Sequence, residues 1–354
     1  MTPRPLAGLT VIDLSQYIAG PACAQVLADF GADVLKVEPP AGDPSRQLGE
    51  TPHGSVYFRQ YNTGKRCVRL DLASETGRTT LDAMLAEADA VVMNFAARTR
   101  RKLGLDGQQL RQRHPHLVIT TVSAYGPDDD RTALDSVIQA QSGYATLSAD
   151  ADGAPRIAAG YPTDVFSGLY AGLATAMALL DASRDGGTEI DVPMIEVAMV
   201  ALCGTAALGA ASGSAIRAAS GNRDIATAPS TVFPTLDGSV YIYAGLDKHW
   251  ERLRSVVDGP AASAAERLAD PDRFERTVAA WTESRTAAAV LEEMERLGIA
   301  AAPVERIDAA LATMRRERPG AVIADIDGVP VPQFPATFGA ERIRRAAATE
   351  EEIS

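Results

Sequence analysis

The first part of the chain alternates between short apolar runs rich in β-branched residues and longer stretches with the periodicity of an amphipathic helix. Apolar runs of this length predict strands, and the periodic stretches predict helices. Strands are expected at 9–15, 33–38, 66–72, 90–95 and 117–126, and helices at 20–32, 75–88 and 98–113. A connection between neighbouring parallel strands must cross over the sheet, and a helix usually makes this crossover. Strands that alternate with helices are therefore expected to pair in parallel. The pattern therefore predicts an α/β fold with a doubly wound parallel sheet.

The second part of the chain has a more varied pattern. A long uncharged helix is expected at 164–182, followed by a strand and a helix within 188–202. The small residues of 204–224 predict a linker or loop. A turn at Asp237-Gly238 predicts a β-hairpin over 230–245. Further helices are expected at 247–257 and 273–296, and the final "RRAAATEEEIS" is expected to be a frayed polar tail.

Composition narrows the classes of protein that fit this pattern. A chain of 354 residues that is 46% hydrophobic and 23% charged is typical of a globular protein with two domains. The net charge of -12 argues against nonspecific binding to nucleic acid or to anionic membranes. The first residues lack the pattern of a signal peptide, and no apolar run is long enough to predict a membrane span. We therefore expect a cytoplasmic protein without nucleic-acid or membrane partners.

Two kinds of cofactor site can be tested against the sequence. The three cysteines, Cys23, Cys67 and Cys203, lack the spacing of a zinc site or of a disulfide framework, so no metal is expected. Glu38 at the end of the second strand would suit a nicotinamide cofactor. However, the turn "SQYIAGPACAQ" contains only Gly20 and lacks the G-x-G-x-x-G spacing that such a cofactor requires. A nicotinamide cofactor is therefore not expected.

Asp164 is the most conspicuous candidate for chemistry. It stands directly before the stretch Val165–Leu180, which carries no charge. A carboxylate in the first turn of a helix can cap that helix, a contribution of about 1 kcal/mol. It can also act as a nucleophile. The residues alone leave both roles open.

Seven phrases along the chain are much more specific together than any one of them. They are "GLTVIDLSQYIAGPACAQVLADFGADVLKVEPPAGDPSR" (8–46), "NTGKRCVRLDL" (62–72), "ADAVVMNF" (88–95), "HLVITTVSAYG" (116–126), "LDSVIQAQSGY" (134–144), "GYPTDVFSGLYAGLATAMALL" (160–180) and "TEIDVPMIEVAM" (188–199). With them the chain resembles the family III CoA-transferases, the CaiB/BaiF family, which also includes α-methylacyl-CoA racemases. The resemblance is specific for the family and does not identify the substrate.

The resemblance implies a domain organisation and a set of partners. A large Rossmann-like domain is expected over 1–203 and 331–354, with a linker at 204–224 and a second, smaller domain over 225–330. The family also implies an interlocked homodimer. The implied substrates are an acyl-CoA and a small carboxylic acid, with coenzyme A as the group that is transferred and no metal.

Asp164 matches the catalytic aspartate of the family. The resemblance implies that its carboxylate attacks the acyl-CoA thioester to give an aspartyl anhydride, and that CoA then attacks the aspartyl carbonyl to give an aspartyl-CoA thioester. Gly160 and Gly168 would let backbone amides approach the developing oxyanion.

The resemblance also suggests which residues contact CoA. Asn94 and Phe95 follow a predicted parallel strand, where open α/β sheets bind ligands. Lys102 matches a basic residue for the nucleotide phosphates, a task that the neighbouring arginines could share. The remaining expected contacts are Leu103, Leu70 and Ile18. Lys65 and Arg66 form a basic turn that is either structural or in contact with phosphate.

Departures from the family pattern keep two alternatives open. Ile18 and Pro39 stand where formyl-CoA transferase-like members carry Gln and Arg. Asp135 matches a common family acid whose expected task is to orient a loop. The racemases of the family carry a His where this chain has Leu134, and His249 is expected on a surface helix. An α-methylacyl-CoA racemase or epimerase is therefore the first alternative, and a non-catalytic acyl-CoA-binding protein is the second.

Overall fold

The computed structural model describes residues 4–52, 54–150, 152–181, 186–212, 221–320, 323–326 and 329–351. The chain divides into two compact units. The first comprises Met1–Ser142, Ala158–Leu202 and Met314–Ser354, and the second comprises Gly143–Ile157 and Cys203–Thr313. The C-terminal part of the chain thus returns to the unit in which the chain begins.

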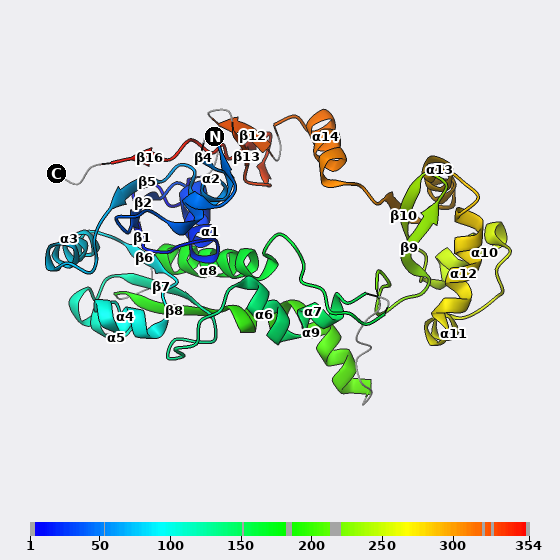
Figure 1. Cartoon of the computed structure of the whole chain (residues 1–354), viewed down its shortest axis with the longest axis horizontal. Helices are drawn as coiled ribbons and strands as arrows, with labels where there is room; N and C mark the ends of the chain where they lie inside the picture. Colours follow the sequence, from blue (N-terminus) through cyan, green and yellow to red (C-terminus); the bar gives the residue numbers. More distant parts are fainter. Residues whose placement is uncertain are drawn as a thin grey trace. The chain divides into compact units, whose positions relative to one another are not determined.

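A seven-stranded sheet is the frame of the first unit, and all of its neighbouring strands pair in parallel. Its strands, in spatial order, are β16 (Thr349–Glu350), β5 (Arg66–Arg69), β2 (Asp33–Glu38), β1 (Thr10–Asp13), β6 (Ala90–Met93), β7 (Val118–Ser123) and β8 (Thr188–Pro193). The chain builds outward from β1 through β2 and β5, then crosses to β6 on the other side of β1 (Figure 1). This confirms the predicted doubly wound, Rossmann-like sheet.

Alternating residues of the strands face two different hydrophobic cores. Val11, Val34 and Val118 face a core closed by helices α1 (Ala19–Asp29) and α8 (Pro162–Leu180). Their neighbours Ile12 and Leu35 face a second core, closed by α3 (Glu75–Ala86) and α5 (Gly107–Arg113). Both faces of the central strands β1, β2, β6 and β7 are buried, which explains why these strands are largely apolar in sequence.

The long uncharged helix of the sequence is α8. It packs closely on α1, because a Cβ at Gly168 would lie 2.6 Å from the carbonyl oxygen of Ala19. Among the described helices, α8 alone is long and apolar enough to cross a membrane by length and composition, a test that helices packed on a sheet also pass. Gly168 therefore serves helix packing.

Two predictions for the first unit need correction. The helix expected at 98–113 is two helices, α4 (Ala97–Leu103) and α5, separated where Gly104 takes a left-handed φ of 70° and Asp106 caps the next helix. The expected polar tail contains β16, which pairs with β5. Arg345 of the same segment forms a salt bridge with buried Asp29 at 2.7 Å. This segment is therefore an edge of the sheet.

The other elements of the first unit are short, apart from a helix that continues into the second unit. They are η1 (Pro44–Gln47), β3 (Glu50–Thr51), β4 (Gly54–Ser55), α2 (Val56–Asn62), α6 (Asp135–Ser142), α9 (Met194–Ser212), β12 (Ile323–Ile326), β13 (Val329–Pro332), β14 (Thr337–Phe338) and β15 (Glu341–Arg342). Helix α9 extends into the stretch expected to be a linker. Residues 213–220 of that stretch lie outside the described residues.

The second unit contains the predicted hairpin. Strands β9 (Ser230–Thr235) and β10 (Gly238–Tyr243) pair in antiparallel fashion, and β11 (Ala300–Pro303) extends their sheet. The helices are α7 (Tyr144–Leu147), α10 (Asp247–Val257), α11 (Ala264–Ala269), α12 (Pro271–Thr282), α13 (Ala287–Leu297) and α14 (Ile307–Glu317), which continues into the first unit. The single helix expected at 273–296 is wrong, because Thr286 caps a separate helix, α13.

Candidate active site

The sheet reverses its direction of growth between β1 and β6. At such a switch point the connections after the two strands diverge, which leaves a crevice where α/β proteins bind ligands. A cavity of about 250 Å³ lies at this place. It is lined by the segments that follow β1, β6 and β7, and by Asp164 from the first turn of α8.

Polar side chains hold the segment that follows β1. The amide of Asn94 accepts a hydrogen bond from the backbone N–H of Gln16 at 2.9 Å and donates one to its carbonyl at 2.8 Å. Lys36 donates to the carbonyl of Ser15 at 2.8 Å. Asn94 therefore ties the ends of β1 and β6 together across the switch point, in addition to lining the cavity.

A cluster of fully buried charges lies beneath this segment. Lys65 pairs with Asp13 at 2.8 Å, and Lys36 pairs with Asp43 at 2.9 Å. Burial opposes the ionisation of Asp13, but the two lysines outweigh it, so the pKa of Asp13 lies below its usual value. Lys65 is 0% exposed, and the alternative that it contacts a phosphate is therefore wrong. Arg66 pairs with Asp33 and with Glu351 at the surface.

Asp135 caps the helix that carries Asp164. Its Oδ2 accepts hydrogen bonds from the backbone N–H of Thr163 at 2.8 Å and of Asp164 at 3.1 Å. The Thr163 hydroxyl donates to the same oxygen at 2.6 Å, and Gln139 donates to the other oxygen. Asp135 is 2% exposed. The capping role that the sequence left open for Asp164 thus belongs to Asp135.

The carboxylate of Asp164 has a different environment. Among the described residues, none donates a hydrogen bond to it. Burial and the nearby carboxylate of Asp135 raise the pKa of Asp164 to about 7. Tyr61 of α2 lies close by, and burial together with the charge of Asp164 raises the pKa of its phenol to about 12. The site therefore holds a carboxylate that changes charge near neutral pH.

Three of the residues expected to contact CoA line the same cavity as Asp164. They are Asn94, Phe95 and Ile18. Ile18 is 5% exposed and packs with Tyr61 and Val165, next to the catalytic candidate. The cavity wall at this position is therefore apolar.

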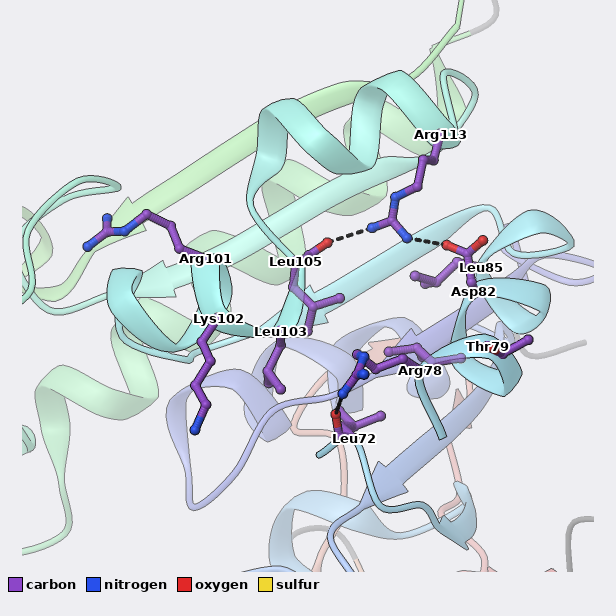
Figure 2. Close-up of a pocket in the computed structure, with 12 residues that line it drawn as sticks. Leu72, Arg78, Thr79, Asp82, Leu85, Arg101, Lys102, Leu103, Leu105 and Arg113 are labelled. Atoms are coloured by element: carbon purple, nitrogen blue, oxygen red, sulfur yellow. Dashed lines mark hydrogen bonds and ion pairs between the residues drawn. The ribbon is translucent and has the colours of Figure 1, made fainter. Parts of the chain in front are cut away.

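Lys102 and Leu103 line a second pocket, of about 500 Å³, between α3 and the α4–α5 segment (Figure 2). Its lining combines leucine side chains with the charged residues Arg78, Asp82, Arg101, Lys102 and Arg113. Arg101 points away from the other labelled residues in Figure 2 and pairs with Asp130 at 2.7 Å.

The remaining residues expected near CoA have other surroundings. Arg100 is 3% exposed and donates to the Thr121 hydroxyl at 3.3 Å, so it is structural. Leu70 lines neither pocket, but it packs on the same hydrophobic core as Phe95 and Leu103.

Tyr17 and Arg131 are among the cavity-lining residues that the sequence analysis did not predict. Tyr17 lies in the segment after β1, and Arg131 lies in the loop before α6. Arg131 pairs with Asp129 at 2.7 Å and stacks on Tyr125 at 3.9 Å. The sequence did carry a signal for Arg131, because it is a basic residue within the acidic stretch before Asp135.

The residues that bear on a racemase are also placed. Leu134 lines the cavity and is 61% exposed, at the position where a racemase of this family would carry His. His249 lies on α10 of the second unit. No group of three or more potential metal ligands occurs among the described residues.

Comparison with known proteins agrees with this architecture. Residues 6–349 match CoA-transferase family III. A probable fatty acyl-CoA transferase of Mycobacterium tuberculosis is 33% identical over 284 residues, which cover 75% of this chain and 72% of that protein. A succinate–glutarate CoA-transferase of Agrobacterium fabrum is 33% identical over 279 residues, which cover 75% of this chain and 69% of that protein.

Solved structures extend the likeness over the chain. The crystal structure of the M. tuberculosis protein in its orthorhombic form has a TM-score of 0.85 at 27% identity, and covers 99% of this chain and 98% of that one. A CaiB/BaiF family protein from Brucella suis has a TM-score of 0.83 at 28% identity, with 99% and 97% covered.

Proposed function

The chain belongs to CoA-transferase family III, and from this premise we propose that it moves CoA between two carboxylic acids through Asp164. The observation that carries the proposal is the carboxylate at the switch-point cavity. Its backbone N–H is held by Asp135, while its own oxygens accept no hydrogen bond from the described residues. Such a carboxylate is free to attack.

The proposed reaction needs four substitutions at carbonyl carbons. An Asp164 oxygen attacks the thioester carbonyl and CoA thiolate leaves, which gives an acyl–aspartyl anhydride. CoA thiolate then attacks the Asp164 carbonyl and releases the first acid. The acceptor carboxylate attacks this aspartyl-CoA thioester and expels CoA thiolate, which finally attacks the new acyl carbonyl. Asp164 is regenerated and no net proton is consumed.

CoA binding is proposed to use both pockets of the first unit. The nucleotide would lie in the pocket of Lys102 and Leu103, where the exposed Lys102 lines the wall together with arginine and leucine side chains. The thioester would reach Asp164 past Phe95, which lines the cavity and packs on the same core as Leu103. Pro39 stands where formyl-CoA transferase-like members carry Arg, so this chain has no positive charge at that position. Arg131, which lines the cavity, is proposed to supply the positive charge instead.

The names of two relatives suggest which acids to test as substrates. The A. fabrum relative is named for succinate and glutarate, and the M. tuberculosis relative for fatty acyl-CoA. We therefore propose that a succinyl-CoA donor with glutarate, and a fatty acyl-CoA donor with succinate, are the first pairs to test. We also propose that the enzyme works in the cytoplasm.

Chemical trapping tests the proposed role of Asp164. The enzyme is incubated with the two donors, with and without acceptor, and then treated with hydroxylamine. Mass spectrometry of a digest should find the hydroxamate at Asp164 only when a donor thioester is present. A modified site elsewhere, or transfer without any trapped aspartate, would contradict the mechanism.

Isotope exchange separates this proposal from a racemase. Removal of an α-proton and its return on the opposite face need two acid/base groups, and Leu134 cannot serve as one. We expect a 2-methylacyl-CoA in deuterated water to gain no deuterium at the α-carbon. Rapid exchange without transfer of CoA would establish the racemase instead, and CoA binding with neither reaction would establish a binding protein.

A homodimer is proposed as well, and helix α8 supports it. The side of α8 that faces away from α1 is apolar and exposed at Phe166, Leu169, Tyr170, Leu173, Met177 and Leu180. Exposed apolar surface of this extent is typical of an interface. Sedimentation at micromolar concentration should show a dimer, and a monomer would refute this part of the proposal.

A further inference from the structure

Three non-glycine residues among those described have a positive φ angle. They are Tyr17 at 64°, Tyr161 at 56° and Asp258 at 54°. The left-handed region crowds the Cβ against the backbone and is unusual for a bulky residue. Asp258 ends helix α10, where this conformation is common. The two tyrosines, by contrast, flank the candidate active site, since Tyr17 lines its cavity and Tyr161 precedes the helix of Asp164.

The backbone of Tyr17 is held by its surroundings. Its N–H donates to Asp43 at 3.3 Å, and the two preceding residues are held by Lys36 and Asn94. Lys36 and Asp43 are 0% and 1% exposed. A strained residue persists only where the structure around it determines its conformation, and such residues cluster at functional sites.

The side chain of Tyr17 does not fill the hydrophobic core. It is 39% exposed and forms part of the cavity wall, beside Ile18. Core packing therefore does not explain why this position holds a tyrosine, when glycine would remove the strain. A role in ligand binding does explain it.

We propose that Tyr17 determines which acyl groups the enzyme accepts, because its ring limits the space beside Asp164. The proposal rests on the proposed function of Asp164. An acyl group whose carbonyl reaches that carboxylate must place its first carbons in this cavity. In the binding proposed above, the CoA nucleotide lies in the pocket of Lys102 and Leu103, and only the thiol end of CoA reaches this cavity. Loss of the ring should thus admit bulkier acyl groups and leave the binding of free CoA unchanged.

Strain is tested by paired substitutions. Tyr17→Ala and Tyr17→Gly both remove the ring and differ only in the Cβ. At an ordinary position alanine is the more stable of the two, whereas at a left-handed position glycine is. We expect the Tm of Tyr17→Gly to exceed that of Tyr17→Ala, and the same order for Asp258→Gly and Asp258→Ala. A higher Tm for Tyr17→Ala would contradict the imposed conformation.

Selectivity is tested by calorimetry with free CoA, acetyl-CoA and benzoyl-CoA. In both ring-less variants, we expect the ratio of Kd for benzoyl-CoA to Kd for acetyl-CoA to fall at least about tenfold, the scale on which pockets discriminate small groups. Tyr17→Phe and the Asp258 variants should keep the wild-type ratio. Binding requires no turnover, so failure of the transfer chemistry would be seen separately. An unchanged ratio, or a change confined to free CoA, would overturn the proposal.

Discussion

Asp13 and Asp164 are carboxylates of the same compact unit in opposite surroundings. Asp13 ends β1, is 0% exposed, and contacts Lys65 at 2.8 Å. Asp164 lies in the first turn of α8, and the charge that perturbs its pKa is another carboxylate, that of Asp135. The pKa of Asp13 is held below its usual value, whereas that of Asp164 is raised to about 7.

The difference shows how one unit uses buried charge for two purposes. The paired cluster around Asp13 fixes the segment after β1, because Lys36 and Asp43 of that cluster hold its backbone. The unpaired carboxylate of Asp164 costs stability when it ionises, and that cost is the mark of a functional site. Substitutions at Asp13 and Asp164 should therefore have opposite effects on the stability of the protein.

Substitution of Asp164 should have the largest effect of all on activity. We expect Asp164→Asn to lower CoA transfer by at least about 10³-fold, because it removes the nucleophile. The raised pKa means that stability falls as pH rises through about 7. At pH 8 the Asn variant should therefore be more stable than the wild type, with a Tm at least about 3 °C higher.

The two readouts separate the possible roles of Asp164. A residue that only capped its helix would lower the Tm on substitution and leave transfer intact. Wild-type turnover in Asp164→Asn would thus remove the nucleophile from the mechanism.

Substitution of Asp13 should mainly affect stability. Asp13→Asn leaves Lys65 and Lys36 buried with less compensation, a change that typically costs about 3–5 kcal/mol. Urea unfolding would measure the loss of free energy of unfolding. The control is Asp33→Asn. The side chain of Asp33 is 53% exposed and pairs with Arg66, so the loss of free energy of unfolding should be within about 1 kcal/mol.

Acid should also distinguish Asp13 from Asp164. Because the pKa of Asp13 is lowered, its contribution to stability is present at neutral pH and is lost as pH falls through that lowered value. Equal losses in Asp13→Asn and Asp33→Asn would contradict the structural role of the cluster.

Lys102 allows a smaller test, outside the cavity. We expect Lys102→Ala to weaken CoA binding by about 1.5–3 kcal/mol, the typical value of a hydrogen bond to a charged group. Calorimetry with free CoA would measure the change in Kd. Arg66→Ala is the control, because Arg66 pairs with Asp33 and Glu351 at the surface and lines neither pocket, so its loss should change the Kd little. An unchanged Kd in Lys102→Ala would move the nucleotide to another site.

The sequence predicted much of the first unit because its signals there are local. Apolar runs between helices indicated where the strands lie in the chain, and the uncharged stretch after Asp164 indicated α8. Two breaks were missed, at Gly104 and before Thr286, since helical periodicity continues across both. The two-residue strand β16 is too short to carry a periodic signal.

The charged parts of the site could not be predicted in the same way. Lysine is rarely buried, so Lys36 and Lys65 read as surface residues although both are 0% exposed. Capping rules relate residues within one turn, whereas Asp135 caps α8 from a different helix, α6. Long-range pairing of polar groups depends on the completed fold, which local patterns do not encode.

The smallest expected effect concerns the contact between Asp135 and Asp164. In the wild type, kcat/KM for transfer should rise with pH around a midpoint of about 7, because Asp164 must be ionised to attack. Asp135→Asn keeps an oxygen for the N–H groups of Thr163 and Asp164 but removes the negative charge. Without the negative charge of Asp135, the pKa of Asp164 is lower, so the midpoint should move to lower pH, by on the order of one unit. Asp33→Asn, which removes an exposed carboxylate outside the cavity, is the control and should leave the midpoint near 7. If Asp135 only supported the helix, Asp135→Asn would change the Tm alone, and a midpoint that stays near 7 would show that the neighbouring carboxylate does not set the ionisation of the nucleophile.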